Sequence, residues 1–232
     1  MLRFLTCGES HGPMLISMLD GFPAGLSLDK ERLDSELARR QKGYGRGSRQ
    51  KIEQDRVEFV GGVRHGTTTG APIGVKIENR DWQNWQTVMS QEPVDLSDPA
   101  VAEALEKKTI KHFRPGHADL AGTIKYGHED VRNVLERASA RETASRIALG
   151  SICRQLLERF GIRVISHVRQ VGDVQAAEID PSASLSELEE LIEASELSCV
   201  DSTATEAMKA TIKKAWQDGD SLGGVIEVIA EG

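Results

Sequence analysis

The chain has 232 residues, of which 39% are hydrophobic and 28% are charged, and its net charge is −7. This composition is typical of a water-soluble globular protein with a sizeable core, and the acidic balance argues against a general nucleic-acid or membrane-binding surface. No apolar run has the length of a transmembrane helix. The three cysteines are far apart and show neither metal-binding nor disulfide spacing, which favours a reducing, cytoplasmic location.

The first half of the chain predicts short strands separated by turns and by one clear helix. Strands are expected at about residues 2–7, 14–19, 57–60 and 73–77. The helix is expected at about residues 29–40, where Leu33 and Leu37 lie four positions apart. The polar segment "ENRDWQNWQ" is predicted to be an exposed loop or flap, and only a short helix is expected at residues 99–105.

The second half contains the longest predicted helix. It opens at Ser139, which has the S-x-x-E spacing of a capping box with Glu142, and it ends at Gly161. Further elements are expected as a strand at 162–168, helices at 185–196 and 206–216, and a last strand at 224–230. Because hairpins and strand–helix units are mixed, the predicted fold class is α+β or layered α/β, in one domain over residues 1–232.

Positive charge is concentrated in the segment "LARRQKGYGRGSRQKI", residues 37–52. It contains no acid, and its basic residues are Arg39, Arg40, Lys42, Arg46, Arg49 and Lys51. Arginine binds phosphate and carboxylate in a bidentate manner, and glycine lets backbone amides approach an anion. Three interpretations stay open, namely a site for a small polyanion, a solvated basic loop, and an RNA-binding segment.

Two histidines lie in predicted loops. His11 stands in "ESHGP" directly after the first strand, and His117 stands in "RPGHAD", two residues before Asp119. A loop imidazole titrates near neutrality and can act as a general acid or base. The alternative for each is a turn that happens to contain a histidine. Neither histidine has the spacing of a metal site, so no metal is predicted.

The start of the long helix is a third candidate site. A helix N-terminus offers unpaired N–H groups and positive potential, and here Arg137 and Arg141 flank it. The alternative is an ordinary capped helix with exposed arginines. Together, the arginine-rich loop, the two histidines and this helix start predict a site for an anionic, phosphorylated small molecule, with imidazole as the proton donor.

Five segments resemble, in order and spacing, the motifs of the chorismate synthase family. They are "GESHGP", "RRQKGYGRGSRQ", "GGVRHGTTTGAPIGV", "FRPGHADLAGTIKYG" and "ERASARETASRIALG". The family is usually considerably longer, so the chain resembles the N-terminal portion of such an enzyme. The resemblance implies a β-α-β sandwich, incomplete here at the C-terminus, and a cytoplasmic homotetramer. The 232-residue form is expected to be weak or inactive alone.

The implied reaction is the anti 1,4-elimination of phosphate from 5-enolpyruvylshikimate 3-phosphate, which gives chorismate in the shikimate pathway of aromatic amino acid biosynthesis. This lyase reaction requires reduced FMN, with NADPH as the reductant in bifunctional members. No nucleic-acid or membrane partner is expected. The alternatives are an inactive fragment and an anion- or RNA-binding module built on residues 39–51.

The resemblance also implies roles for individual residues. His11 would protonate the departing phosphate, and His117 would manage the protonation of the reduced flavin. The implied substrate contacts are Ser10, Arg40, Arg46, Arg49, Arg114 and Arg141. The implied FMN contacts are Arg137, Ala138 and Ser139, and the family associates Arg40 and Arg46 with NADPH.

Overall fold

The computed structural model describes residues 1–45 and 54–232, which divide into two compact units. Unit 1 comprises Met1–Ala38 and Lys51–Ile152, and unit 2 comprises Arg39–Gln50 and Cys153–Gly232. The expectation of one domain over residues 1–232 stays a prediction. Among the residues described, none of the helices combines the length and the apolar character that crossing a membrane requires.

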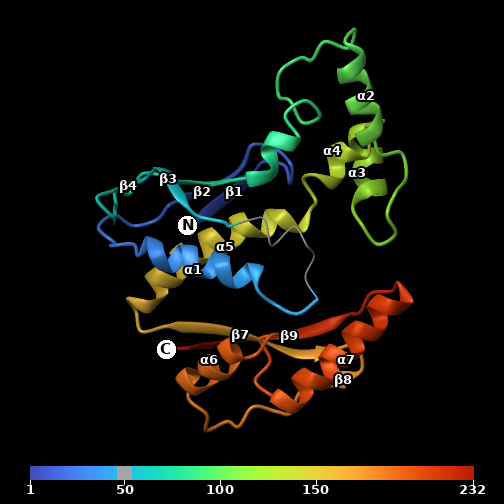
Figure 1. Cartoon of the computed structure of the whole chain (residues 1–232). Helices are drawn as coiled ribbons and strands as arrows, with labels where there is room; N and C mark the ends of the chain where they lie inside the picture. Colours follow the sequence, from blue (N-terminus) through green and yellow to red (C-terminus); the bar gives the residue numbers. More distant parts are fainter. Residues whose placement is uncertain (46–53) are drawn as a thin grey trace. The chain divides into compact units, whose positions relative to one another are not determined.

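Unit 1 contains a four-stranded antiparallel sheet in the order β1-β2-β6-β3 (Figure 1). Its strands are β1 (Arg3–Cys7), β2 (Met14–Asp20), β3 (Glu58–Gly61) and β6 (Ile73–Glu78). All four lie close to their predicted bounds. A small hairpin pairs β4 (Val63–Arg64) with β5 (Thr67–Thr68).

One face of this sheet forms part of the core of unit 1. The buried apolar side chains on β2 and β6 are Leu15, Leu19, Ile73, Val75 and Ile77. Helices α1 (Lys30–Gln41) and α5 (Thr143–Glu158) lie to one side of the sheet in Figure 1. The predicted pair Leu33 and Leu37 of α1 is fully buried, which confirms the four-residue spacing as the inward face of that helix.

The remaining helices of unit 1 are short. They are η2 (Arg80–Asn84), α2 (Pro99–Lys108), α3 (Asp119–Tyr126), α4 (Arg132–Leu135) and η3 (Ala140–Glu142). Helix α2 is longer than predicted and is capped by Asp98, whose side chain accepts a hydrogen bond from the backbone N–H of Ala100. The sequence analysis did not predict α3 or α4, because eight and four residues are too short for a clear helical period.

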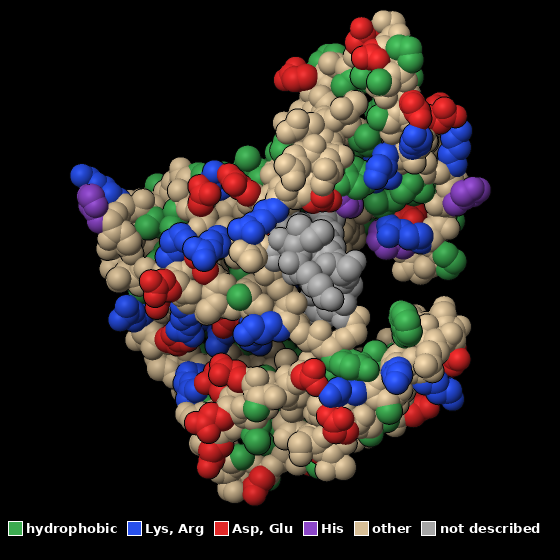
Figure 2. All heavy atoms as spheres, in the orientation of Figure 1, with side chains coloured by type: hydrophobic (Ala, Val, Ile, Leu, Met, Phe, Trp, Pro, Cys, Tyr) green, Lys and Arg blue, Asp and Glu red, His purple; other side chains and the backbone are tan. Residues whose placement is uncertain are grey.

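Unit 2 is a three-stranded antiparallel sheet with two helices. The sheet order is β8-β7-β9, and the elements are β7 (Arg163–Val171), β8 (Val174–Gln175), β9 (Gly224–Glu231), α6 (Leu185–Ala194) and α7 (Ser202–Asp218). The buried side chains of α6 pack against Ile165 of β7. Acidic and basic side chains are interspersed over the face of this unit that Figure 2 shows.

The predicted capping box at Ser139 and Glu142 is wrong. Ser139 does cap a helical turn, but its side chain accepts from the N–H of Arg141, and the Glu142 carboxylate accepts instead from the hydroxyl of Thr6. The first turn is a 3-10 helix, so the donor positions differ from those of an α-helix. The sheets of both units are antiparallel and combined with helices, so the α+β prediction is confirmed.

Candidate active site

The loop between β1 and β2 carries His11, and the first constraint on its shape is Gly8. This glycine has a φ of +97°, and a Cβ at the same place would lie 2.4 Å from the carbonyl oxygen of Met14. Only glycine tolerates both the positive φ and the close approach of the backbone. The sheet therefore delivers His11 on a tight connection directly after its first strand.

A second constraint comes from Asn79, which follows β6. The side-chain amide of Asn79 donates to the carbonyl oxygens of Glu9 and Gly12, at 3.1 and 2.7 Å. Its backbone N–H donates to the carbonyl oxygen of Pro13 at 3.0 Å. Because β2 and β6 are paired in the sheet, their register brings Asn79 beside the loop. These three hydrogen bonds fix the backbone on both sides of His11.

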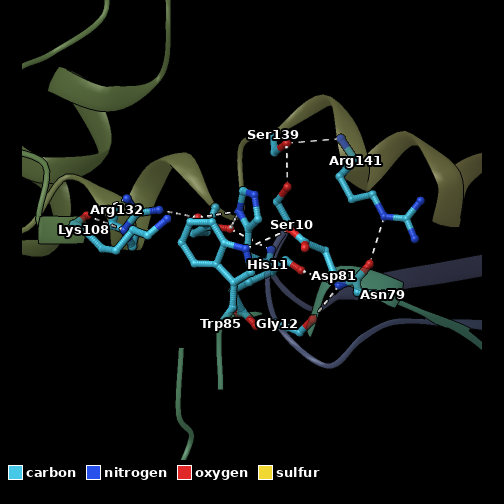
Figure 3. Close-up of polar contacts among 12 residues, drawn as sticks. Ser10, His11, Gly12, Asn79, Asp81, Trp85, Lys108, Arg132, Ser139 and Arg141 are labelled. Atoms are coloured by element: carbon cyan, nitrogen blue, oxygen red, sulfur yellow. Dashed lines mark hydrogen bonds and ion pairs between the residues drawn. The ribbon is translucent and has the colours of Figure 1, made fainter. Parts of the chain in front are cut away.

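The side chain of His11 is bound to a carboxylate from a distant segment. Its Nδ1 lies 2.9 Å from each carboxylate oxygen of Glu136, and its backbone N–H donates to Oε2 of Glu136 at 2.8 Å. The His11 side chain is 20% exposed, whereas that of Glu136 is fully buried. Figure 3 shows the imidazole beside Trp85, whose ring centroid lies 3.9 Å from that of His11.

Glu136 is itself held by a buried arginine. Nη1 of Arg132 donates to Oε1 of Glu136 at 2.8 Å, and Nε of Arg132 donates to the carbonyl oxygen of Lys108 at 2.7 Å. Burial raises the pKa of Glu136, but hydrogen bonds and charge from His11 and Arg132 lower it more, so this pKa lies below its usual range. Glu136 is therefore an ionised carboxylate at neutral pH.

Trp85 packs against the imidazole of His11 and is partly buried. The prediction that its segment is an exposed loop is therefore wrong at this residue. Its indole N–H donates to the carboxylate of Asp81 at 2.8 Å, within the segment that forms η2. Nζ of Lys108 lies 4.1 Å from the Trp85 ring centroid, and the guanidinium carbon of Arg132 lies 5.0 Å from it. The aromatic ring contributes apolar surface next to His11, and the two cations add attraction to its π-system.

The start of the long helix lies against the same loop. Ser139 Oγ donates to Ser10 Oγ at 3.1 Å, and the backbone N–H of Arg141 donates to Ser139 Oγ at 3.2 Å (Figure 3). Two segments that the sequence analysis had singled out separately, 129 positions apart, are thus in contact. The hydroxyl of Ser10 adjoins His11, as expected for a shared site.

Arg141 is buried and bound to protein groups. Its Nη1 donates to both carboxylate oxygens of Asp55 at 2.6 Å, and its Nε donates to the side-chain oxygen of Asn79 at 2.9 Å. Both the Arg141 and the Asp55 side chains are at most 5% exposed. The substrate contact implied for Arg141 stays a prediction. In this structure Arg141 holds the side chain of Asn79, which in turn binds the loop of His11.

The second predicted histidine also pairs with a buried carboxylate. Nδ1 of His117 contacts Oδ1 of Asp119, and Arg114 donates to Oδ2 of Asp119 from both its Nε and its backbone N–H, each at 3.0 Å. The Asp119 side chain is fully buried. The hydrogen bond from the Arg114 side chain holds the pKa of Asp119 well below its usual value, although burial opposes this.

Unit 1 contains a cavity of about 760 Å³ close to these segments. It is bordered by Glu9, close to His11 in sequence, by Ala118, which follows His117, and by the predicted flavin-contacting run 137–139. Its basic side chains are Lys125, His128, Arg137 and Arg146. Nη2 of Arg137 donates to Thr6, whereas its Nη1 is buried and has no hydrogen-bond partner among the described residues.

Only part of the arginine-rich segment lies within the described residues. Arg46 and Arg49 lie outside the described residues. Arg40 is half-buried near the end of α1 and belongs to unit 2, whereas both histidines belong to unit 1. Within the described ranges, no group of three or more His, Cys, Asp or Glu side chains could hold a metal ion.

Glu136, Trp85 and Asn79 were not singled out from the sequence. Each contacts His11 or its loop from a separate segment, so no local spacing relates them to it. The one available signal was that Glu136 lies three residues before Ser139, in a segment already recognised as a candidate site.

Comparison with known proteins gives a consistent result. The sequence model of one family, described as chorismate synthase, matches residues 2–232. A relative named chorismate synthase from Geobacillus thermodenitrificans is 53% identical over 231 residues, and one from Symbiobacterium thermophilum is 52% identical over 235. Each match covers 100% of this chain and 58% of the relative.

A solved structure described as a crystal structure of chorismate synthase aligns with a TM-score of 0.73 and 38% sequence identity. The alignment covers 99% of this chain and 58% of the solved one. The chain therefore spans somewhat more than half the length of the proteins that it matches, and the match includes every segment of the candidate site.

Proposed function

This chain belongs to the chorismate synthase family, and we propose that the protein carrying it is a lyase that eliminates phosphate from 5-enolpyruvylshikimate 3-phosphate to give chorismate. The observation that carries the proposal is the clamped loop of His11, which contacts the start of the helix at Ser139 within segments that match the family. Because the chain spans 58% of its relatives, the activity is proposed for the protein as a whole.

His11 is the proposed general acid. Departure of phosphate leaves negative charge on the leaving oxygen, and an imidazolium supplies both a proton and a positive charge at that point. The geometry supports this role because the imidazole is partly exposed, while its backbone is held by Glu136 and its loop by Asn79. The hydroxyl of Ser10 is a neighbouring hydrogen-bonding group for the same phosphate.

Cationic side chains are proposed to neutralise the rest of the anion. Arg114 is about half exposed and keeps donors beyond those that bind Asp119, so it is suited to a carboxylate or phosphate. The roles of Arg40, Arg46 and Arg49 are carried over from the family resemblance alone. Arg141, bound to Asp55 and Asn79, is proposed to act through the loop that it supports.

Reduced FMN is the proposed cofactor, and the cavity beside residues 137–139 fits it. The cavity volume of about 760 Å³ lies within the range of small-molecule sites, roughly 300–1,000 Å³. The cavity is lined by Lys125, Arg137 and Arg146 and by Glu142, which pairs with both arginines. Lys125 and Nη1 of Arg137, a buried donor with no partner in the described residues, are the groups proposed to meet a phosphate. When bound, the reduced flavin supplies electron density to the substrate as phosphate leaves.

His117 is proposed to hold a proton at this cavity. Its ring nitrogen Nδ1 is bound to Asp119, and the next residue, Ala118, lines the cavity wall. The carboxylate of Asp119 and Nη2 of Arg114, which lies 3.1 and 3.2 Å from the two ring nitrogens, hold the ring in place. NADPH as the reductant, a homotetramer and a cytoplasmic location are parts of the same proposal that rest on the family alone.

The test is an anaerobic assay of chorismate formation with the phosphorylated substrate and reduced FMN. We expect turnover by the whole protein that carries this chain, with the Geobacillus thermodenitrificans relative as a positive comparison. His11→Ala should reduce kcat by about 10²–10⁴-fold while the protein stays folded. His112→Ala, which removes an exposed histidine outside the described site, is the matched control and should have wild-type activity.

Two results would oppose the proposal. One is no chorismate from the wild-type protein under conditions in which the relative is active. The other is His11→Ala with a kcat close to wild type. Binding of single-stranded RNA with a steep salt dependence, without any effect of the small phosphate, would favour the RNA-binding alternative instead.

A further inference from the structure

We propose that Glu136 is the positioning residue of His11, and that its carboxylate holds the proton on Nδ1 so that Nε2 is the nitrogen that serves the substrate. This inference rests on the proposed function, because it concerns the same proton donor. Glu136 is the first residue of the family segment "ERASARETASRIALG", but the resemblance implied no role for it. It acts through His11 and contacts neither substrate nor cofactor in this proposal.

The charge of the Glu136 carboxylate sets the direction of its hydrogen bond with His11. An ionised carboxylate has lone pairs but no proton to donate, so a nitrogen that is hydrogen-bonded to it must carry the proton. Nδ1 of His11 lies 2.9 Å from both oxygens of Glu136. The lowered pKa of Glu136 supports the ionised form at neutral pH. The tautomer with hydrogen on Nδ1 is therefore the one that the site selects.

Glu136 orients the backbone of the loop as well as the His11 ring. Its Oε2 accepts from the N–H of His11 at 2.8 Å, and its carbonyl oxygen accepts from the N–H of Ser10 at 3.1 Å. One residue thus binds two consecutive residues of the loop through three of its own oxygens. This arrangement limits rotation of the imidazole and of the peptide that carries it.

Charged groups from several elements surround the His11 imidazole. Glu136 is fully buried and would be costly to ionise alone, but Arg132 donates to its Oε1. From the other elements, Lys108 lies over the Trp85 ring that covers His11, and Asp81 accepts from that ring. Glu136 contacts the His11 side chain directly, because both of its carboxylate oxygens lie 2.9 Å from Nδ1. Its negative charge therefore lies against the ring nitrogen that carries the proton.

In the proposed step a proton moves from His11 to the departing phosphate. The N–H bond at Nε2 breaks, an O–H bond forms on the phosphate, and the imidazolium becomes a neutral imidazole. The Nδ1–H bond to Glu136 persists throughout, and the carboxylate does not become protonated. Nε2 regains a proton before the next cycle. A flipped or exchanged tautomer would present the wrong nitrogen and block this sequence.

Glu136→Gln is the decisive variant because it keeps the size of the side chain and removes its charge. We expect kcat to fall by about 10²–10⁴-fold, with a much smaller change in KM. The second readout is ¹⁵N NMR of His11 in the 232-residue chain at a pH where the ring is neutral. The wild type should show the Nδ1–H tautomer, and Glu136→Gln should show a shift toward the Nε2–H tautomer.

Two further variants frame this result. Glu103→Gln, on the exposed surface of α2, is the control and should change neither readout. Glu136→Asp keeps the charge and should retain the Nδ1–H tautomer and part of kcat. If Glu136→Gln fails to fold, Glu136→Asp becomes the test of the proposal. The shorter side chain moves the carboxylate away from His11, so a kcat equal to that of the wild type would overturn the positioning role.

The inference and the proposed function fail in different ways. A folded Glu136→Gln protein with the wild-type tautomer or with wild-type kcat overturns the positioning role, while His11→Ala can still abolish chorismate formation. If the wild type forms no chorismate, the proposed function fails, and the tautomer still reports whether Glu136 controls the His11 ring.

Discussion

Replacement of Asp55 by alanine tests whether the buried ion pair with Arg141 supports the active-site loop. Two hydrogen bonds of 2.6 Å join the guanidinium to the carboxylate, and both side chains are at most 5% exposed. Removal of one partner of a buried pair leaves an uncompensated charge and typically costs about 3–5 kcal/mol. We therefore expect Asp55→Ala to lower the free energy of unfolding by about that amount.

The effect should be large enough to measure easily. A folded domain has a total stability of about 5–15 kcal/mol, and each 1.4 kcal/mol is roughly a factor of ten in the unfolded fraction. Urea unfolding followed by circular dichroism gives the difference directly. Asp95→Ala is the control, since Asp95 is exposed and bonds only its own turn, and it should cost less than about 1 kcal/mol.

A second comparison separates the ion pair from simple loss of packing. In Asp55→Ala combined with Arg141→Met, the unpaired charge is gone, so part of the lost stability should return. A loss below about 1 kcal/mol in the single variant Asp55→Ala would refute the reasoning, because it would mean that solvent or other groups satisfy Arg141. It would also leave Arg141 available for the substrate contact that the family resemblance implies.

Three further changes test other parts of the structure. The pKa of Asp119 is lowered from its usual value near 3.8, so the stability that the ionised carboxylate contributes is present above that pH and is lost as the pH falls. Asp119→Asn should therefore flatten the acid side of a plot of unfolding free energy against pH. Ser184→Ala removes the capping box that Ser184 forms with Glu187 at the start of α6, and it should cost about 1 kcal/mol in urea unfolding. Gly122→Ala should cost about 1–3 kcal/mol in the same assay, because the added Cβ would meet Val134 Cγ1 at 2.4 Å; wild-type stability in any of these variants would contradict the corresponding contact.

Much of the fold could be predicted because its signals are local. The strands of unit 1 and the inward face of α1 follow from the alternation of apolar residues and from a four-residue spacing. Short helices such as α3 and α4 escaped prediction because they are stabilised by packing, as the close approach of Gly122 to Val134 shows. The error at Ser139 arose because a sequence pattern does not distinguish a 3-10 turn from an α-helical one.

The sequence by itself determined which segments bear chemistry, since loop histidines, clustered arginines and a polar helix start are visible in the order of residues. Only the tertiary structure decided their partners. Glu136 binds His11 across 125 positions, and Asp55 binds Arg141 across 86. The physical reason is that such pairs depend on the register of β2 with β6 and on the tight connection at Gly8, which bring distant residues together with no periodic signal in the chain. The imidazole was readable from its motif, whereas the carboxylate that selects its tautomer emerged only from the fold.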